Sequence, residues 1–154
     1  MAYQAKGRTF DQFADGELIE TCARTITEAD VVAFAALSGD WNPLHTDSVW
    51  AANTPFKERI AHGMLVASVA TGLANASGVF EGTTIALLSM TNRWTGPVRF
   101  GDTIHMDMKV ANKKETGKPD RGVITFANTV RNQKGDAVLE GEWVVMMKRS
   151  PKTA

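Results

Sequence analysis

The stretch "SGDWNPLHTD", from Ser38 to Asp47, places an aspartate and a histidine on either side of a proline. Pro43 fixes its own φ angle and restricts Asn42 to extended conformations, so the segment from Asp40 to His45 is expected to be a stiff loop. A carboxylate and an imidazole that converge on one water molecule can act as general base and general acid. Aspartate, asparagine and proline are also ordinary turn residues, so either residue alone favours a structural role. Together they predict an acid–base pair.

A second cluster, "IAHGML" at Ile60 to Leu65, stands at the start of an apolar helical segment. Unpaired N–H groups and the helix dipole favour negative charge there. Gly63 lets a ligand carbonyl approach the backbone closely, which would suit an oxyanion or enolate developing on a thioester. The alternative is a plain helix boundary with His62 packed beside it, and a structural role is the expectation for His62.

Other chemistries find little support in the sequence. His45, Asp47 and His62 are conceivable metal ligands, but no HExxH or paired-histidine spacing is present, so no metal is predicted. Dinucleotide-binding, P-loop and GxSxG signatures are absent as well. Cys22 is the only cysteine, so no intramolecular disulfide can form.

Helical patterns occupy the part of the chain that carries both clusters. A helix is predicted over residues 28–37. Thr27 is its expected N-cap, Asp30 occupies a capping-box position, and Gly39 is expected to be a left-handed C-cap. Its apolar face is expected to consist of Ala29, Val32, Ala33, Ala36 and Leu37. A short helix is predicted at 48–53. The helix that begins near Gly63 is apolar around most of its circumference, which indicates a buried helix.

Strands are predicted on both sides of these helices. Residues 1–24 suggest an extended arm with one strand near 17–24, and residues 83–94, 104–110, 123–130 and 137–147 have strand patterns joined by turn sequences. This order of elements predicts an α+β fold in which a curved antiparallel sheet wraps around the buried helix.

Composition narrows the classes of protein. The chain has 154 residues, 44% of them hydrophobic and 22% charged, which predicts one globular domain over 1–154. Seventeen basic residues balance seventeen acidic ones, so no nucleic-acid or membrane partner is expected. The sequence shows neither a signal peptide nor an apolar run of about 20 residues, so a cytoplasmic location is expected.

The two clusters together resemble the hydratase-2 motif of the MaoC-like, (R)-specific enoyl-CoA hydratases. "SGDWNPLHTD" is followed by "FKERIAHGML", and "GPVRFGDTI" is similar to the entry into a long strand of that family. The resemblance covers a core at 25–148, after the arm at 1–24. It implies a hot-dog fold and a homodimer or higher homo-oligomer with acyl-CoA bound between subunits. The implied reaction is reversible syn addition of water to a trans-2-enoyl-CoA in fatty acid metabolism, with coenzyme A as part of the substrate and no other cofactor.

The resemblance also implies roles for individual residues. Asp40 and His45 would hold the catalytic water and move protons, and the N–H of Gly63 would polarise the thioester carbonyl. Asn42 would support the loop, and Thr71 stands where some relatives carry a serine near the site. Lys57, Arg59, Arg93 and Arg99 are candidates for binding the phosphates of coenzyme A. Two alternatives stay open, namely an acyl-CoA thioesterase and a non-catalytic acyl-thioester-binding protein.

Overall fold

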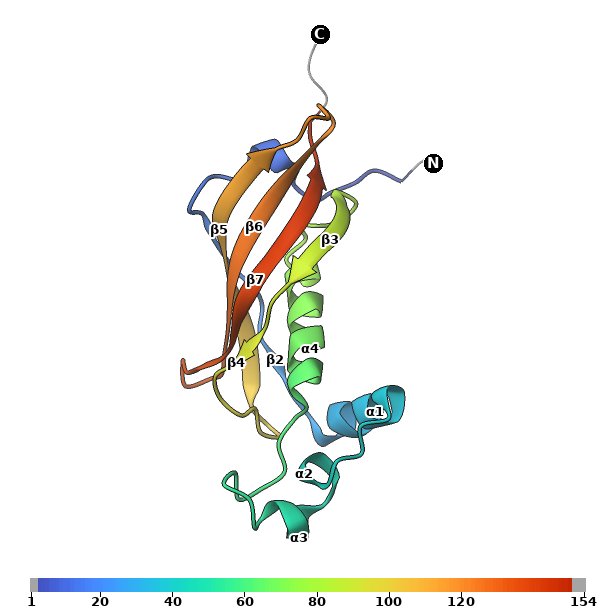
Figure 1. The fold of residues 1–154 in the computed structure, drawn as a ribbon, viewed down its shortest axis with the longest axis vertical. Coiled ribbons are helices and arrows are strands. Elements are labelled where there is room, and N and C mark those ends of the chain that lie inside the picture. The colour runs from blue at the N-terminus through green and yellow to red at the C-terminus, as the bar shows by residue number, and fades with distance from the viewer. Residues whose placement is uncertain (1–2, 151–154) are drawn as a thin grey trace.

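The structure, a computed structural model, describes residues 3–150 as a set of short N-terminal elements, a helical region and a long-stranded sheet (Figure 1). In chain order the elements are a 3₁₀ helix η1 (Phe10–Gln12), β1 (Leu18–Glu20), β2 (Arg24–Thr25), α1 (Glu28–Ser38), α2 (Pro43–Thr46), α3 (Ser48–Ala51), α4 (Gly63–Ala76), β3 (Thr84–Met90), β4 (Arg93–Trp94), β5 (Thr103–Glu115), β6 (Arg121–Arg131) and β7 (Ala137–Lys148).

The strands form one antiparallel sheet in the order β1-β5-β6-β7-β3, with β2 also paired to β5 and β4 to β7. This sheet curves around α4, while α1, α2 and α3 lie together beyond the N-terminal end of α4 (Figure 1). The predicted α+β class and the hot-dog architecture are therefore confirmed. The predicted strand at 83–94 is divided into β3 and β4.

The alternating pattern of the long strands builds the core. Ile104, Met106, Met108 and Val110 of β5 are at most 1% exposed, as their spacing predicts. The even-numbered residues of β6 from 122 to 130 are likewise buried. This inward row packs against the buried side of α4, which consists of Leu65, Val66, Ala67, Val69, Ala70, Leu73 and Ala74.

The prediction that α4 is buried on most of its circumference is only partly right. Met64 is 52% exposed, and Ser68, Thr71 and Gly72 are exposed as well. Because a single chain supplies one curved sheet, only one side of the helix is covered. The other side of α4 remains open next to the free edge of β3.

Helix α1 has the predicted ends but not the predicted buried face. The side chain of Thr27 accepts a hydrogen bond from the N–H of Asp30, and Gly39 closes the helix with φ +77°. The buried residues are Val31 and Ala35, however, while Leu37 is 85% exposed. Apolar residues occur on more than one side of this alanine-rich helix, so its sequence alone does not determine which side meets the core.

The N-terminal arm is more than the predicted extended segment, because two of its aromatic residues belong to the core. Phe10 and Phe13 are 4% and 2% exposed, and the ring of Phe13 meets that of Phe126 edge to face. The predicted strand is present as β1, followed by β2 at Arg24.

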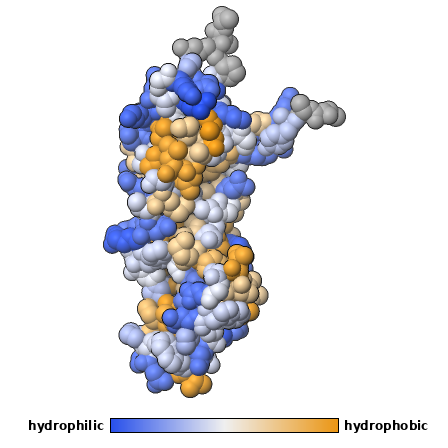
Figure 2. Space-filling model, turned by 45° about the vertical axis from the view of Figure 1, so that its right-hand side comes forward, coloured by the Kyte–Doolittle hydropathy of each residue, from blue (hydrophilic) through white to orange (hydrophobic). Residues whose placement is uncertain are grey.

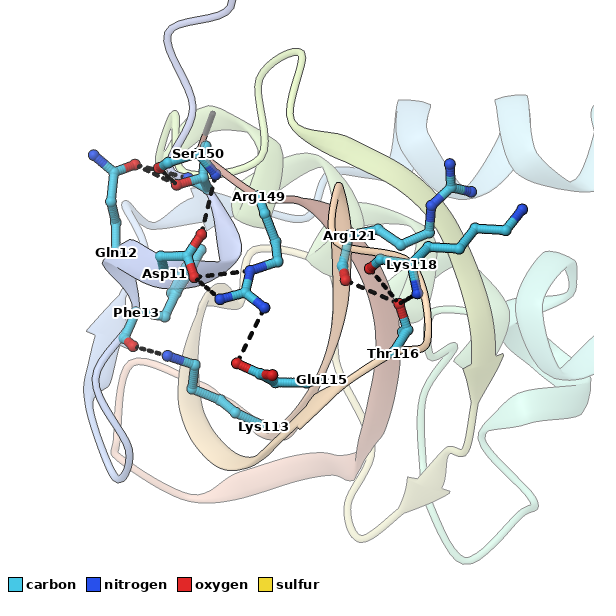
Figure 3. Close-up of polar contacts among 11 residues, drawn as sticks. Asp11, Gln12, Phe13, Lys113, Glu115, Thr116, Lys118, Arg121, Arg149 and Ser150 are labelled. Carbon is cyan, nitrogen blue, oxygen red and sulfur yellow. Dashed lines mark hydrogen bonds and ion pairs between the residues drawn. The ribbon is translucent and has the colours of Figure 1, made fainter. Parts of the chain in front are cut away.

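Ion pairs attach this arm to the end of β7. The guanidinium of Arg149 donates to the carboxylate of Asp11 at 2.7 Å and pairs with Glu115 at 3.0 Å, while Lys113 Nζ donates to the carbonyl of Phe13 (Figure 3). Arg149 thereby links η1 with β5. None of the helices in residues 3–150 is long and apolar enough to span a membrane.

Candidate active site

The segment from Gly39 to His45 folds into a left-handed cap followed by a one-turn helix. Asn42 is the N-cap of α2, its side-chain oxygen accepts from the N–H of Leu44 at 3.0 Å, and Pro43 is the first helical residue. Proline is favoured there because its missing N–H would be unpaired anyway. The second half of the predicted stiff loop, from Pro43 on, is therefore the start of the helix α2, which holds His45 at 9% exposure.

The imidazole of His45 has a defined orientation. Its Nδ1 lies 2.7 Å from the carbonyl oxygen of Ile60, which can only accept, so Nδ1 carries a proton. In the neutral ring Nε2 is then the free acceptor. Burial lowers the pKa of His45 below its ordinary 6.5, the bond to Ile60 opposes this, and the neighbouring His62 adds to the lowering. His45 is consequently neutral at pH 7 and suited to accept a proton.

His62 connects the two predicted catalytic residues. Its ring lies 3.8 Å from that of His45 between centroids, at 30° between planes, and its Nε2 donates to the backbone carbonyl of Asp40 at 2.9 Å. His62 is 2% exposed, and its Nδ1 is buried without a partner among the described residues. His62 is therefore in direct contact with both Asp40 and the ring of His45.

Asp40 brings a carboxylate to the same place from the turn after α1. The side chain is exposed and accepts from the N–H of Asn42 at 3.2 Å. One polar atom each from Asp40, His45 and His62 lie within 4.8 Å of one another, and these three residues could also hold a cation. Asp47, which the sequence also offered as a metal ligand, instead caps α3 by accepting from Val49 and Trp50.

The first turn of α4 supplies unpaired backbone donors beside this group. The helix begins at Gly63, as predicted, and its N-cap His62 makes no side-chain capping bond. The Nε1 atom of Trp94 would lie 2.5 Å from a Cβ atom at Gly63. Glycine is thus required here by the close approach of the indole rather than by its φ angle, which lies outside the left-handed region.

A pocket of about 850 Å³ contains these groups. Asp40, His45, His62 and Gly63 all line it, together with the largely apolar set Phe34, Ser38, Leu44, Phe56, Ile60, Ala61, Met64, Val66, Trp94, Thr95, Gly96, Pro97, Val98 and Val138. The volume is typical of sites for small organic ligands, which are mostly apolar with a few oriented polar groups.

Two predicted site residues do not line this pocket. Asn42 points its oxygen into the backbone of α2. Thr71 lies on the exposed side of α4, where its hydroxyl donates to the carbonyl of Ser68 at 2.7 Å. Within one chain, Thr71 is therefore separate from Asp40 and His45.

The predicted basic residues are absent from the pocket wall as well. Arg59 pairs with Glu28 and Arg99 with Glu58, each at 2.5 Å, and Arg93 pairs with Glu140.

Trp94 is one of the lining residues that the sequence did not predict, and it lies against Gly63. It comes from β4, thirty-one positions after Gly63, and no local pattern links the two. The only signal in the sequence was a glycine at a helix start, which indicates close approach of some other group without naming it.

An antiparallel sheet that curves around one helix is the hot-dog fold, and in this chain a histidine–aspartate group lies at the N-terminus of that helix. A Mycobacterium tuberculosis protein described as having a double hotdog fold has a TM-score of 0.84 at 22% identity, and the match covers 99% of this chain and 47% of that one. The family model described as "MaoC like domain" matches residues 11–132. The chain therefore belongs to the MaoC-like dehydratase family, and relatives named (R)-specific enoyl-CoA hydratase and 3-hydroxybutyryl-CoA dehydratase, 33–36% identical over most of the chain, make it an enzyme of the hydratase or dehydratase class.

Relatives extend this assignment over most of the chain. The (R)-specific enoyl-CoA hydratase of Rhodospirillum rubrum is 33% identical over 138 residues, which are 90% of each chain. Protein MaoC of Klebsiella aerogenes is 37% identical over 135 residues. The match covers 87% of this chain but only 37% of the longer Klebsiella protein. The structure described as the monoamine oxidase regulatory protein from Archaeoglobus fulgius has a TM-score of 0.87 at 34% identity, covering 97% of this chain and 100% of that one.

Proposed function

We propose that this protein is an (R)-specific 2-enoyl-CoA hydratase, acting reversibly as a 3-hydroxyacyl-CoA dehydratase. The observation that carries the proposal is the convergence of Asp40, His45 and the start of α4 at Gly63 on one largely apolar pocket. Conjugate hydration needs a water molecule held by an acid–base pair and a donor for charge on the thioester oxygen. The pocket offers both.

The acid–base step falls to Asp40 and His45. The carboxylate of Asp40 accepts one hydrogen of the water, and Nε2 of His45 takes the other proton as the oxygen attacks Cβ of the enoyl group. The lowered pKa of His45 keeps Nε2 unprotonated and ready for this transfer. The proton then returns to Cα from the same pair, so that H and OH add to one face of the double bond.

The electron pair displaced from the double bond moves to the thioester oxygen. Backbone N–H groups at Gly63 and the positive end of the α4 dipole stabilise this enolate charge. A donor of this kind contributes about 10²–10³ in rate, and the acid–base pair roughly 10²–10⁴.

The test is hydration of crotonyl-CoA, followed by loss of the ultraviolet absorbance of the enoyl thioester, with the chirality of the product determined. The expected product is the (R)-alcohol. Asp40→Asn and His45→Gln should each lose most of the turnover, whereas the matched controls Asp15→Asn and His105→Gln, which change residues outside the pocket, should keep it.

Near wild-type turnover in Asp40→Asn or His45→Gln would contradict the roles given to these residues. Release of free coenzyme A thiol without hydration, across short and medium enoyl-CoA substrates, would instead identify a thioesterase. Tight binding without either reaction would identify a binding protein.

The working form that we propose is a homodimer joined through β3 and the open side of α4. β3 ends the sheet and exposes Ile85, Leu87 and Leu88, which are 39%, 49% and 50% exposed. Figure 2 brings this side of the molecule forward and shows a hydrophobic patch on its upper half. Edge pairing of two β3 strands would cover this surface, and Thr71 would then face the partner.

Light scattering during gel filtration tests the dimer. Leu88→Lys should yield a monomer, because the charge would be buried at the joined edge. Leu18→Lys is the matched control, since Leu18 is a 56% exposed leucine on β1 at the opposite edge of the sheet. A wild-type monomer, or an unchanged dimer in Leu88→Lys, would contradict this interface.

A further inference from the structure

The loop between α3 and α4 contains a lysine in a strained backbone conformation. Lys57 has φ +65° and is the only residue other than glycine with a positive φ angle in residues 3–150. The left-handed region is unfavourable for a residue with a Cβ atom, and residues that are held there gather at functional sites. A glycine would adopt the same conformation without strain. The strain at Lys57 therefore points to a role for its side chain that glycine could not fill.

Lys57 lies next to the pocket that contains Asp40 and His45. Phe56, its neighbour in the chain, lines the pocket and is partly buried, whereas Lys57 itself is exposed and is not part of the pocket wall. Three residues after Lys57, the carbonyl of Ile60 holds the imidazole of His45. The loop thus passes from solvent at Lys57 to the acid–base group within a few residues.

The charge of Lys57 is not used within the protein. Both of the next two residues in the chain are paired, Glu58 with Arg99 and Arg59 with Glu28, each at 2.5 Å. The ammonium group of Lys57 makes no ion pair within residues 3–150. It can therefore bind an anionic part of a ligand without first breaking an internal ion pair.

The substrate class proposed above has its anionic groups at a matching place. In an acyl-CoA the uncharged pantetheine arm separates the thioester from the phosphates. With the thioester at Gly63, the arm must run outward along the pocket, and the phosphates must bind outside its wall. No lysine or arginine is among the residues that line the pocket in the described part of the chain. A cation for the phosphates is therefore needed next to the pocket, where Lys57 lies.

We propose that Lys57 binds a phosphate group of the coenzyme A part of the substrate. The inference rests on the hydratase function proposed above and adds a residue that recognises the coenzyme. The lysine ammonium is a compact charge with three donors, which suits a phosphate. Because the contact is exposed to solvent, it contributes as much as an exposed ion pair.

The experiment compares kcat/KM for crotonyl-CoA with that for crotonyl-pantetheine, which carries the same thioester without phosphates. Lys57→Met, which removes the charge but keeps the length of the side chain, should lower the ratio of the two values by about fivefold, the upper range for an exposed ion pair. Lys57→Arg should keep the ratio, because it retains the cation. Lys134→Met is the matched control, since Lys134 is exposed in the turn between β6 and β7.

Lys57→Gly separates binding from folding. Glycine relieves the left-handed strain, so Tm should not fall, yet the ratio should fall as it does in Lys57→Met. A ratio within about twofold of wild type in both Lys57→Met and Lys57→Gly would overturn the inference.

The two substrates also distinguish this inference from the hydratase function. If wild type hydrates crotonyl-pantetheine and the ratio is the same in every variant, only the role of Lys57 is wrong. If wild type hydrates neither substrate, the hydratase function is wrong. Calorimetric titration of wild type and Lys57→Met with coenzyme A then tests Lys57 directly, and equal affinities would overturn its role.

Discussion

Substitution of Gly63 by alanine tests whether the position of Trp94 controls the site. A Cβ atom at Gly63 would lie 2.5, 2.8 and 2.9 Å from Nε1, Cε2 and Cδ1 of the Trp94 indole. Ordinary contact distances are about 3.5–4.0 Å, so the ring must retreat by roughly 1 Å. Trp94 is 47% exposed and lies on the two-residue strand β4, so it can move outward.

The expected effect is large on activity and small on stability. A displacement of about 1 Å at an active site costs on the order of 10² in rate, which is about 2.7 kcal/mol. For stability, alanine in place of helical glycine gains about 1 kcal/mol, whereas overpacking costs about 1–3 kcal/mol. Because Trp94 can give way, the free energy of unfolding should change by no more than about 1 kcal/mol.

The assay is a double-mutant cycle on kcat/KM for crotonyl-CoA, with urea unfolding of each variant. Gly63→Ala should lose about 10² in kcat/KM in the wild-type background and far less in a Trp94→Leu background, where no indole can clash. Gly117→Ala is the matched control, because nothing lies within 4 Å of a Cβ atom there and its φ angle lies outside the left-handed region. Equal losses from Gly63→Ala in both backgrounds would refute the argument from Trp94.

Three further changes test the description of the site and core. Because burial holds the pKa of His45 below 6.5 in the folded state, the unfolded chain takes up a proton first as the pH falls. Stability should therefore decline below pH 6.5, more steeply in wild type than in His45→Gln, and identical pH slopes in urea unfolding would contradict this. Phe13→Ala should lower the free energy of unfolding by about 3–5 kcal/mol, since its ring is 2% exposed, and a loss below about 1 kcal/mol would show that the arm is dispensable. His62→Phe should keep an aromatic ring against His45 but lose the hydrogen bond to the carbonyl of Asp40, so kcat should fall while the fold is retained. Because His62 helps to lower the pKa of His45, the acidic limb of the plot of kcat against pH should move to higher pH in this variant. If the pH dependence of kcat is the same in His62→Phe and wild type, the role of His62 is purely structural.

The sequence alone determined those helix ends and strand faces that depend only on residues close together in the chain. The limits of α1 follow from the capping box at Thr27 and the left-handed Gly39, because both act within one turn of chain. The inward row of β5 follows from strict alternation between Ile104 and Val110. The start of α4 at Gly63 was evident in the same way, and the motif around Asp40 and His45 indicated the family.

Tertiary structure decided everything that depends on segments distant in the chain. The buried face of α1, the entry of Phe10 and Phe13 into the core, and the contact of Trp94 with Gly63 all arise where separate elements meet. Asn128 makes the same point, since in sequence it is one polar residue in a strand. Only the curvature of the sheet around α4 buries this side chain of β6, which is 6% exposed and has no hydrogen-bond partner among residues 3–150, and an unpaired amide carries a free-energy cost there that it would not have in water.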